Sequence, residues 1–211
     1  MKRLLKLLCP SIVLFSILGG CNLFSPENYA EKLTPIDSMS VFHNLINSYN
    51  TMNYDLFTLC LDSASFKFIP EDTTRGSEYR PWGYSEEDAL SFNMFNLFRK
   101  SSRIPPMFLQ IDTTSLNASD TLMNLKANYL LLTPLEEYDT LAGGFELEIV
   151  KRGNYWYISE WKDVQAETLF IPIKHDKKDT TGKTIDTILP KNTLKDWSDL
   201  KVYFLSKYGY Y

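Results

Sequence analysis

Two histidines, three cysteines and 26 acidic residues are the side chains of this 211-residue chain that could exchange protons, attack a substrate or bind a metal. A general acid or base that works near neutral pH would be sought first at a histidine. His43 lies about 100° around a predicted helix from Phe42, at the border of its apolar stripe. His175 lies in the charged segment 174–183. We interpret both as surface residues, so the sequence predicts no catalytic histidine.

Motifs for metal or phosphate chemistry are incomplete. The sequence contains no HExxH, no CxxC and no histidine cluster, so we expect neither a metal site nor a metal cofactor. Gly182-Lys183-Thr184 is similar to the end of a Walker motif, but Lys177 occupies the position where that motif requires glycine. The chain therefore gives no reason to expect a bound cofactor.

Cys21 has the most specific sequence context. Basic residues between Met1 and Lys6 precede an apolar run over 7–18, which suits a secretory signal and is too short for a permanent membrane span. The run ends in Leu18-Gly19-Gly20-Cys21, which resembles the bacterial lipobox. This resemblance implies a signal peptide over 1–20, cleavage before Cys21 and a diacylglyceryl group on its thiol. An ordinary signal peptide with a coincidental cysteine is the alternative.

Lipidation of Cys21 would make the membrane the first partner of the chain, with residues 21–34 as the tether. By resemblance to Gram-negative sorting rules, Asn22 in place of aspartate points to the outer membrane. Removal of Lys2, Arg3 and Lys6 with the signal leaves 19 basic and 26 acidic residues, a net charge of −7. Anionic headgroups and nucleic acid both repel such a body, so we expect the lipid to be the anchor and exclude a nucleic-acid partner.

Cys60 is the one cysteine left after cleavage and lipidation, so no intramolecular disulfide is expected. It lies in the apolar run Leu56-Phe57-Thr58-Leu59-Cys60-Leu61, with no histidine nearby in sequence. We therefore interpret it as a small buried hydrophobic residue and not as a nucleophile.

The elements that must position these residues can be predicted from the spacing of the apolar residues, which changes from a helical to a β period near Pro105. Before it, the apolar spacing predicts helices at 35–49, 54–61 and 85–98, with N-caps at Thr34 and Ser85, a short strand at 66–69 and a loop over 71–84. After it, alternation predicts strands at 107–112, 123–131, 145–149 and 155–159, with a tight turn at 151–154. Helices followed by a meander predict an α+β fold over 35–167, with N-terminal helices packed on a curved antiparallel sheet.

The C-terminal segment 168–211 is expected to form an extension of that domain. Residues 168–174 and 184–189 read as two strands of a hairpin, and Asn192 or Thr193 as the cap of a last helix. Trp197 and Phe204 lie on one side of this helix. Two roles remain open for them: packing back on the sheet or the mouth of a pocket, or docking a partner protein of the cell envelope.

Three segments, 45–57, 61–68 and 153–161, together resemble the nuclear-transport-factor-2-like (NTF2-like, SnoaL-like) superfamily. The first is similar to the family's helix, turn and short second helix, the next to the lead-in of its first strand, and the last to its closing strand. The resemblance covers about residues 35–165. It implies a curved sheet wrapped on a long helix, with a conical pocket between them that side chains fill in many members.

The resemblance also indicates where catalysis would reside. Steroid-isomerase-like members place a general-base aspartate at the end of the first strand, before a proline. Ile69, before Pro70, occupies that position here and has no proton to exchange, while Asp62 comes too early and Asp72 too late. Dehydratase-like members rely on a histidine in the pocket, which neither histidine of this chain is expected to supply.

The function predicted from the sequence is therefore a lipid-anchored envelope protein that acts as a non-catalytic binding or interaction module. Its partner would be an envelope protein or a small apolar ligand. The alternative is a small-molecule enzyme of the isomerase or dehydratase type that uses the conical pocket. Asp62, Tyr129 and Glu148 are the candidates for polar groups near such a pocket.

Overall fold

The computed structural model describes residues 35–102, 107–166 and 195–208. Its elements follow the chain as α1 (Ser38–Thr51), α2 (Tyr54–Thr58), β1 (Lys67–Ile69), β2 (Trp82–Gly83), α3 (Tyr84–Arg99), β3 (Phe108–Ala118), β4 (Leu122–Leu132), the 3-10 helix η2 (Glu136–Tyr138), β5 (Thr140–Arg152), β6 (Tyr155–Val164) and α4 (Trp197–Tyr208). The predicted signal segment, Cys21, the tether, His175 and the predicted hairpin over 168–189 lie outside the described residues.

Helix α1 forms where its apolar stripe was predicted, but it begins later. Asp37, and not Thr34, is the N-cap, because the Asp37 carboxylate accepts a hydrogen bond of 2.7 Å from the Ser40 backbone N–H. The helix ends where Met52 adopts the left-handed conformation, with a φ of 51°. That turn places α2 directly after α1.

The start of α3 also differs from the prediction. Its N-cap is Gly83, which has no side chain to cap the helix, and Ser85 already lies within the helix. The predicted loop before it contains the two-residue strand β2, in which Trp82 pairs with Phe68 of β1. Sequence alternation could not reveal so short a strand, because two residues carry no period.

The six strands form one sheet in the order β2-β1-β6-β5-β4-β3. Strands β3 to β6 make the predicted antiparallel meander, and Gly153, with a φ of 62°, makes the predicted tight turn between β5 and β6. The sheet departs from the predicted antiparallel pairing at one place, because β1 runs parallel to β6. A parallel neighbour is possible there since the whole of β2 to β5 separates the two strands in sequence.

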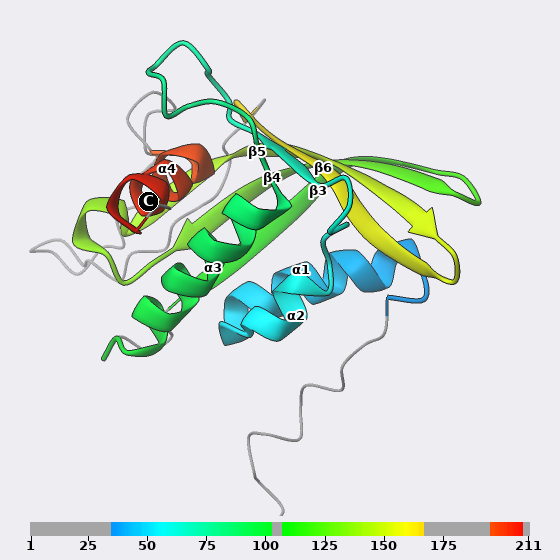
Figure 1. Ribbon diagram of the computed structural model, residues 1–211, viewed down its shortest axis with the longest axis horizontal. Helices are drawn as coiled ribbons and strands as arrows, with labels where there is room; N and C mark the ends of the chain where they lie inside the picture. The colour runs from blue at the N-terminus through cyan, green and yellow to red at the C-terminus, as the bar shows by residue number, and fades with distance from the viewer. Residues whose placement is uncertain (1–34, 103–106, 167–194, 209–211) are drawn as a thin grey trace, which may run out of the picture. The chain divides into compact units, whose positions relative to one another are not determined.

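The predicted α+β architecture is confirmed. Figure 1 shows α1 and α3 across the same face of the twisted sheet, with α4 beside α3. All of these elements belong to one compact unit, Thr34–Tyr211, so α4 is part of the same core as the helices and strands before it. No helix among the described residues is long and apolar enough to span a membrane.

Candidate functional site

The end of β1 carries no group for proton transfer. Ile69 is half-buried there and Pro70 is buried. The preceding residue, Phe68, is fully buried and stacks on Trp82 with ring centroids 4.4 Å apart. The expected position of the isomerase base is therefore built from aromatic and aliphatic packing.

The space between the helices and the sheet is filled by aromatic rings centred on Trp197, the first residue of α4. Its ring centroid lies 4.9 Å from that of Tyr49 on α1, 4.7 Å from Tyr129 on β4 and 4.5 Å from Trp161 on β6. All four side chains have no exposed surface. Trp197 therefore occupies the interior of the fold, and of the two roles left open for it, packing against the sheet is the one observed.

The rings are closely packed, but several of their polar atoms lack a hydrogen bond within the described part of the chain. The Tyr49 hydroxyl and the indole N–H groups of Trp161 and Trp197 have no hydrogen-bond partner among the described residues. An unpaired buried donor costs on the order of 1–3 kcal/mol. Ring packing must therefore supply the stabilisation at this point.

Helix α4 begins at a reciprocal pair of carboxylates. The Asp196 carboxylate accepts a hydrogen bond of 2.8 Å from the Asp199 N–H, and the Asp199 carboxylate accepts one of 3.1 Å from the Asp196 N–H. This arrangement is a capping box in which Asp199 takes the role usually played by glutamate. The prediction that Asn192 or Thr193 caps this helix is wrong by several residues, because the helix begins only at Trp197.

A chain of buried hydrogen bonds attaches the same helix end to the sheet. The Trp197 backbone N–H donates to the Tyr129 hydroxyl at 2.6 Å, and that hydroxyl donates to the Asp163 carboxylate of β6 at 3.3 Å. The Ser198 N–H and hydroxyl donate to the other oxygen of Asp163 at 2.7 and 2.6 Å. Burial raises the pKa of Asp163 to about 7, although the bonds from Ser198 act in the opposite direction.

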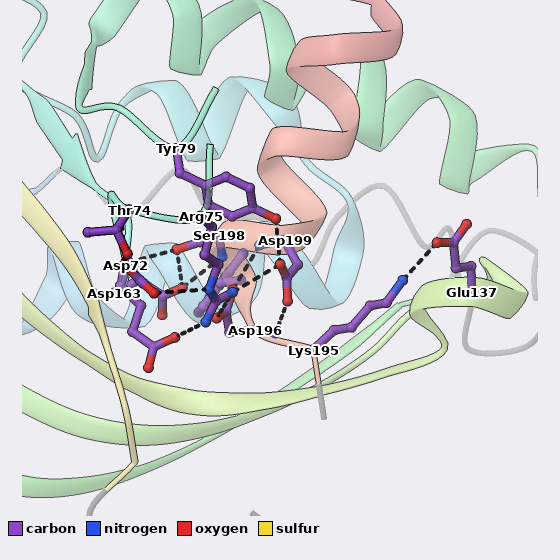
Figure 2. Close-up of polar contacts among 12 residues, drawn as sticks. Asp72, Thr74, Arg75, Tyr79, Glu137, Asp163, Lys195, Asp196, Ser198 and Asp199 are labelled. Atoms are coloured by element: carbon purple, nitrogen blue, oxygen red, sulfur yellow. Dashed lines mark hydrogen bonds and ion pairs between the residues drawn. The ribbon is translucent and has the colours of Figure 1, made fainter. Parts of the chain in front are cut away.

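Arg75 links the loop after β1 to this helix end, as Figure 2 shows. Its guanidinium lies 3.0 Å from the Asp196 carboxylate, 3.1 Å from that of Asp199 and 2.5 Å from that of Glu71. The Tyr79 hydroxyl donates to Asp199 at 2.7 Å. Burial would lower the pKa of Arg75, but the surrounding carboxylates raise it, so the cation is permanent. Burial and the charge of Asp163 raise the pKa of Asp196 to about 8. The ion pairs of Arg75 with Asp199 and Glu71 therefore hold the loop to the start of α4.

A second cation lies deeper, one turn further along α4. Lys201 is fully buried and its ammonium group forms an ion pair with Glu87 of α3, which also accepts a hydrogen bond of 2.8 Å from the Trp82 indole N–H. The same ammonium lies 4.1 Å from the ring centroid of Phe68 and 4.2 Å from that of Trp161. Burial lowers the pKa of Lys201, and the charge of Glu87 opposes that shift. This site holds α3 and α4 against strands β1, β2 and β6.

The three candidates from the sequence do not come together. Tyr129 is part of the buried chain described above. Asp62 is paired at 3.0 Å with Arg152; burial raises its pKa, but hydrogen bonds from Ser65 and Ala64 and the charge of Arg152 lower it overall. Glu148 accepts a hydrogen bond of 2.6 Å from Ser159 between neighbouring strands. Each of the three groups therefore has a structural partner of its own.

The remaining candidates behave as their sequence context indicates. His43 is exposed on α1. Cys60 is fully buried and its thiol points at the carbonyl oxygens of Leu56 and Val41, at 3.3 and 3.6 Å. Burial raises the pKa of this thiol, so it is protonated at neutral pH. The prediction that Cys60 is a small buried hydrophobic residue is confirmed.

Two overlapping hollows on the surface share Ala64, Phe66, Gly83 and Glu86 in their linings, and Trp197 lines neither of them. Glu86, their charged residue in common, pairs with Arg80. No group of three or more histidine, cysteine or acidic side chains that could hold a metal ion occurs among the described residues. The arrangement can therefore position α4, and among the described residues the acidic groups around the start of this helix are engaged with structural partners.

The sequence reasoning missed Arg75, Glu87 and Lys201. One signal was available at the start of α4, because Asp196 and Asp199 stand three apart directly before an apolar run, as in a capping box. No local signal marks Lys201, whose partner Glu87 lies 114 residues earlier.

Comparison with known proteins gives only structural likenesses. No protein-family model matches the chain, and no curated protein matches it. The chain is similar to an NTF-2-like protein of unknown function from Shewanella oneidensis MR-1, with 13% identity and a TM-score of 0.43 over 60% of this chain and 95% of that one. It is also similar to an NTF2-like protein of unknown function from Pseudomonas putida KT2440, with 8% identity and a TM-score of 0.45 over 72% and 93%.

A third solved structure is described by its fold rather than by that family. It is a domain of unknown function with a cystatin-like fold from Nostoc punctiforme PCC 73102. Its identity to this chain is 13%, with a TM-score of 0.45 over 62% of this chain and 75% of that one.

Proposed function

We propose that this chain is a lipid-anchored protein of the bacterial outer membrane whose α+β domain is a non-catalytic interaction module. Cys21 would carry the lipid, and residues 22–34 would tether the folded domain to the membrane surface. The domain would contact other proteins through its outer surface rather than transform a small molecule inside it.

The observation that carries this proposal is the position of Trp197. An enzyme of the isomerase or dehydratase type needs an interior space that substrate can enter and a proton-transfer group that faces it. Here the indole of Trp197 lies within 4.9 Å, centroid to centroid, of the rings of Tyr49, Tyr129 and Trp161. Ile69 takes the place of the expected base.

The buried polar groups support the same reading. Asp163 accepts from Ser198 and Tyr129, and Glu87 is paired with Lys201 and Trp82. Each of these carboxylates is committed to holding α4 in place. A group that is fully buried beneath α4 cannot reach a substrate to exchange a proton with it.

Binding of an apolar probe tests whether the interior is closed. Residues 22–211 would be titrated with 1-anilinonaphthalene-8-sulfonate while the emission of the probe is followed. We expect no saturable binding by the native protein, and binding by Trp197→Ala, which removes the ring that fills the interior. Tyr155→Ala, which removes an exposed aromatic ring of β6, is the matched control and should behave as the native protein. Saturable binding of the probe by the native protein would contradict a filled interior.

The lipid anchor is tested by exchanging one cysteine at a time in the full chain. Cys21→Ala should abolish incorporation of an alkyne-labelled fatty acid and release the protein from the membrane fraction. Cys60→Ala, which alters a buried thiol in the folded domain, should change neither. Labelling that persists in Cys21→Ala would refute the lipid anchor and leave the closed interior untouched.

A further inference from the structure

Strand β3 forms a long edge of the sheet. Among the described residues it pairs with β4 on one side and has no strand on the other. Every residue from Asp112 to Ala118 is exposed, and Leu116 is 47% exposed. The strand contains no lysine, arginine or proline, which protect many edges from pairing with another chain, and its protective features are Asp112 and one bulge. The opposite edge, β2, has only two residues.

The side chain of Asn50 shows which backbone groups of β3 point outward. Its amide oxygen accepts from the Leu109 N–H at 2.6 Å, and its amide nitrogen donates to the Leu109 carbonyl at 3.2 Å. Leu109 therefore directs both of its backbone groups away from β4, toward α1. The direction of the backbone N–H and C=O groups alternates from residue to residue along an antiparallel pair. The backbone groups of Ile111 and Thr113 therefore also point away from β4. Asn50 closes the edge at Leu109 and leaves it open beyond.

A bulge between Thr113 and Ser115 then shifts the alternation by one residue. The Ser119 N–H donates to the Leu122 carbonyl at 2.8 Å, so Ser119 points inward, toward β4. Because the direction alternates, the backbone groups of Ala118 and Leu116 point away from β4. The free edge thus presents the backbone of four residues, which are Ile111, Thr113, Leu116 and Ala118.

We propose that this edge pairs with the same edge of a second copy of the chain, antiparallel and about a two-fold axis between Thr114 and Ser115. In this register Ile111 faces Ala118 of the other copy and Thr113 faces Leu116. The free backbone groups of each of the four residues then face free backbone groups of the other copy. Without the bulge this register would set outward groups against inward ones, so the irregularity that bends the strand also makes it self-complementary.

The side chains agree with this register. Asp112, the charged residue of the strand, faces Asn117 of the second copy, which can donate to its carboxylate. The apolar Leu116 lies beside the methyl group of Thr113. The pairing ends at Ile111 and Ala118, so the turn after Ala118 falls short of the Asn50 side chain that closes the edge. A second copy therefore fits the free edge from end to end.

This contact would be weak in dilute solution and favoured at a membrane. Four residues of each strand exchange main-chain hydrogen bonds, which is a small interface, so we expect a dissociation constant of about 0.1–1 mM. Confinement to a surface raises the effective concentration of the two copies. The inference does not rest on the lipid anchor, because the edge is part of the folded domain alone.

Sedimentation velocity of residues 22–211 between about 10 µM and 1 mM tests the pairing. We expect the weight-average mass to rise toward that of two copies with concentration. Leu116→Lys, which places a charge at the edge, should remain monomeric over the whole range. Asn124→Lys adds the same charge on an exposed position of the inner strand β4 and should associate as the native protein does. A native protein that stays monomeric, or a dimer that survives Leu116→Lys, would overturn the proposal.

Disulfide trapping tests the register independently of affinity. With Ile111→Cys and Ala118→Cys in the same chain, each new thiol faces its counterpart in the other copy. Either single variant places its two thiols seven residues apart along the paired strands, beyond disulfide reach. We expect oxidised dimers from the double variant in at least about tenfold excess over either single variant. Equal trapping in all three variants, or none in the double variant, would refute this register.

Discussion

Two regions of the domain differ in how they are covered: the buried start of α4 and the exposed outer half of the edge strand β3. Where α4 begins, Trp197 and Lys201 have no exposed surface, and the backbone and carboxylates around them are paired. Along the outer half of β3, by contrast, every residue from Asp112 to Ala118 is exposed, and none of the described strands lies beside its outer row of backbone groups. The first region is closed by a segment of the same chain, and the second has the geometry to be closed by another chain.

The difference lies in the chemistry as well as the exposure. The α4 region combines large aromatic rings with charges that would be costly to bury alone, so a single arrangement satisfies them. The β3 edge carries threonine, serine and asparagine, whose exposed side chains do not determine the position of a neighbouring element. Buried charge therefore constrains the position of α4, whereas pairing at the β3 edge depends on the register of the backbone.

The largest expected effect comes from emptying the closed region. Trp197→Ala removes the ring that contacts Tyr49, Tyr129 and Trp161, and should lower the free energy of unfolding by about 3–5 kcal/mol. Urea unfolding followed by circular dichroism would measure this loss. Tyr155→Ala, at an exposed aromatic ring, should cost much less. Equal losses in the two variants would mean that Trp197 contributes little to the core.

Removing one member of the buried ion pair comes next. Lys201→Met leaves the Glu87 carboxylate buried without its cation, and should lower the free energy of unfolding by about 3 kcal/mol. The double variant with Glu87→Gln, which can still accept from Trp82, should recover part of that loss. Additive losses in the double variant would show that the two charges do not stabilise each other in the folded state.

The pH dependence of stability should reveal Asp163. Its pKa is raised from 3.8 to about 7 in the folded protein, so between about pH 4 and 7 the folded state binds more protons than the unfolded state. Stability from this group therefore decreases as the pH rises through that range, by roughly 2–4 kcal/mol. Urea midpoints at pH 5 and 8 should differ less in Asp163→Asn than in the native protein. An unchanged difference would assign the pH dependence to other groups.

Local patterns predicted the fold where local forces decide it. The apolar stripe of Phe42, Leu45 and Tyr49 was predicted from helical periodicity and is observed in α1. The turn at Gly153 was predicted from a glycine between two alternating segments, and this glycine has a positive φ. The parallel pairing of β1 with β6 could not be predicted in this way, since alternation shows that a segment is a strand but not which strand lies beside it.

The candidate site was harder to predict for the same reason. A lysine in an amphipathic helix is normally solvated, and Lys201 is buried only because Glu87, Phe68 and Trp161 converge on it from other elements. Asp196 and Asp199 carried a local capping pattern, whereas their clamp through Arg75 depends on a loop more than a hundred residues away. Sequence periodicity contains no information about such meetings.

The smallest expected effect on folding comes from a substitution at the β3 edge. Leu116→Lys exchanges an exposed side chain at the β3 edge, so the free energy of unfolding should change by no more than about 0.5 kcal/mol. Self-association should nevertheless be lost, because a desolvated ammonium group would face Thr113 of the second copy. Urea unfolding and sedimentation of the same preparation would measure both quantities. A large loss of stability would show that Leu116 packs within its own chain, and the β3 edge would then belong, like α4, to the closed part of the molecule.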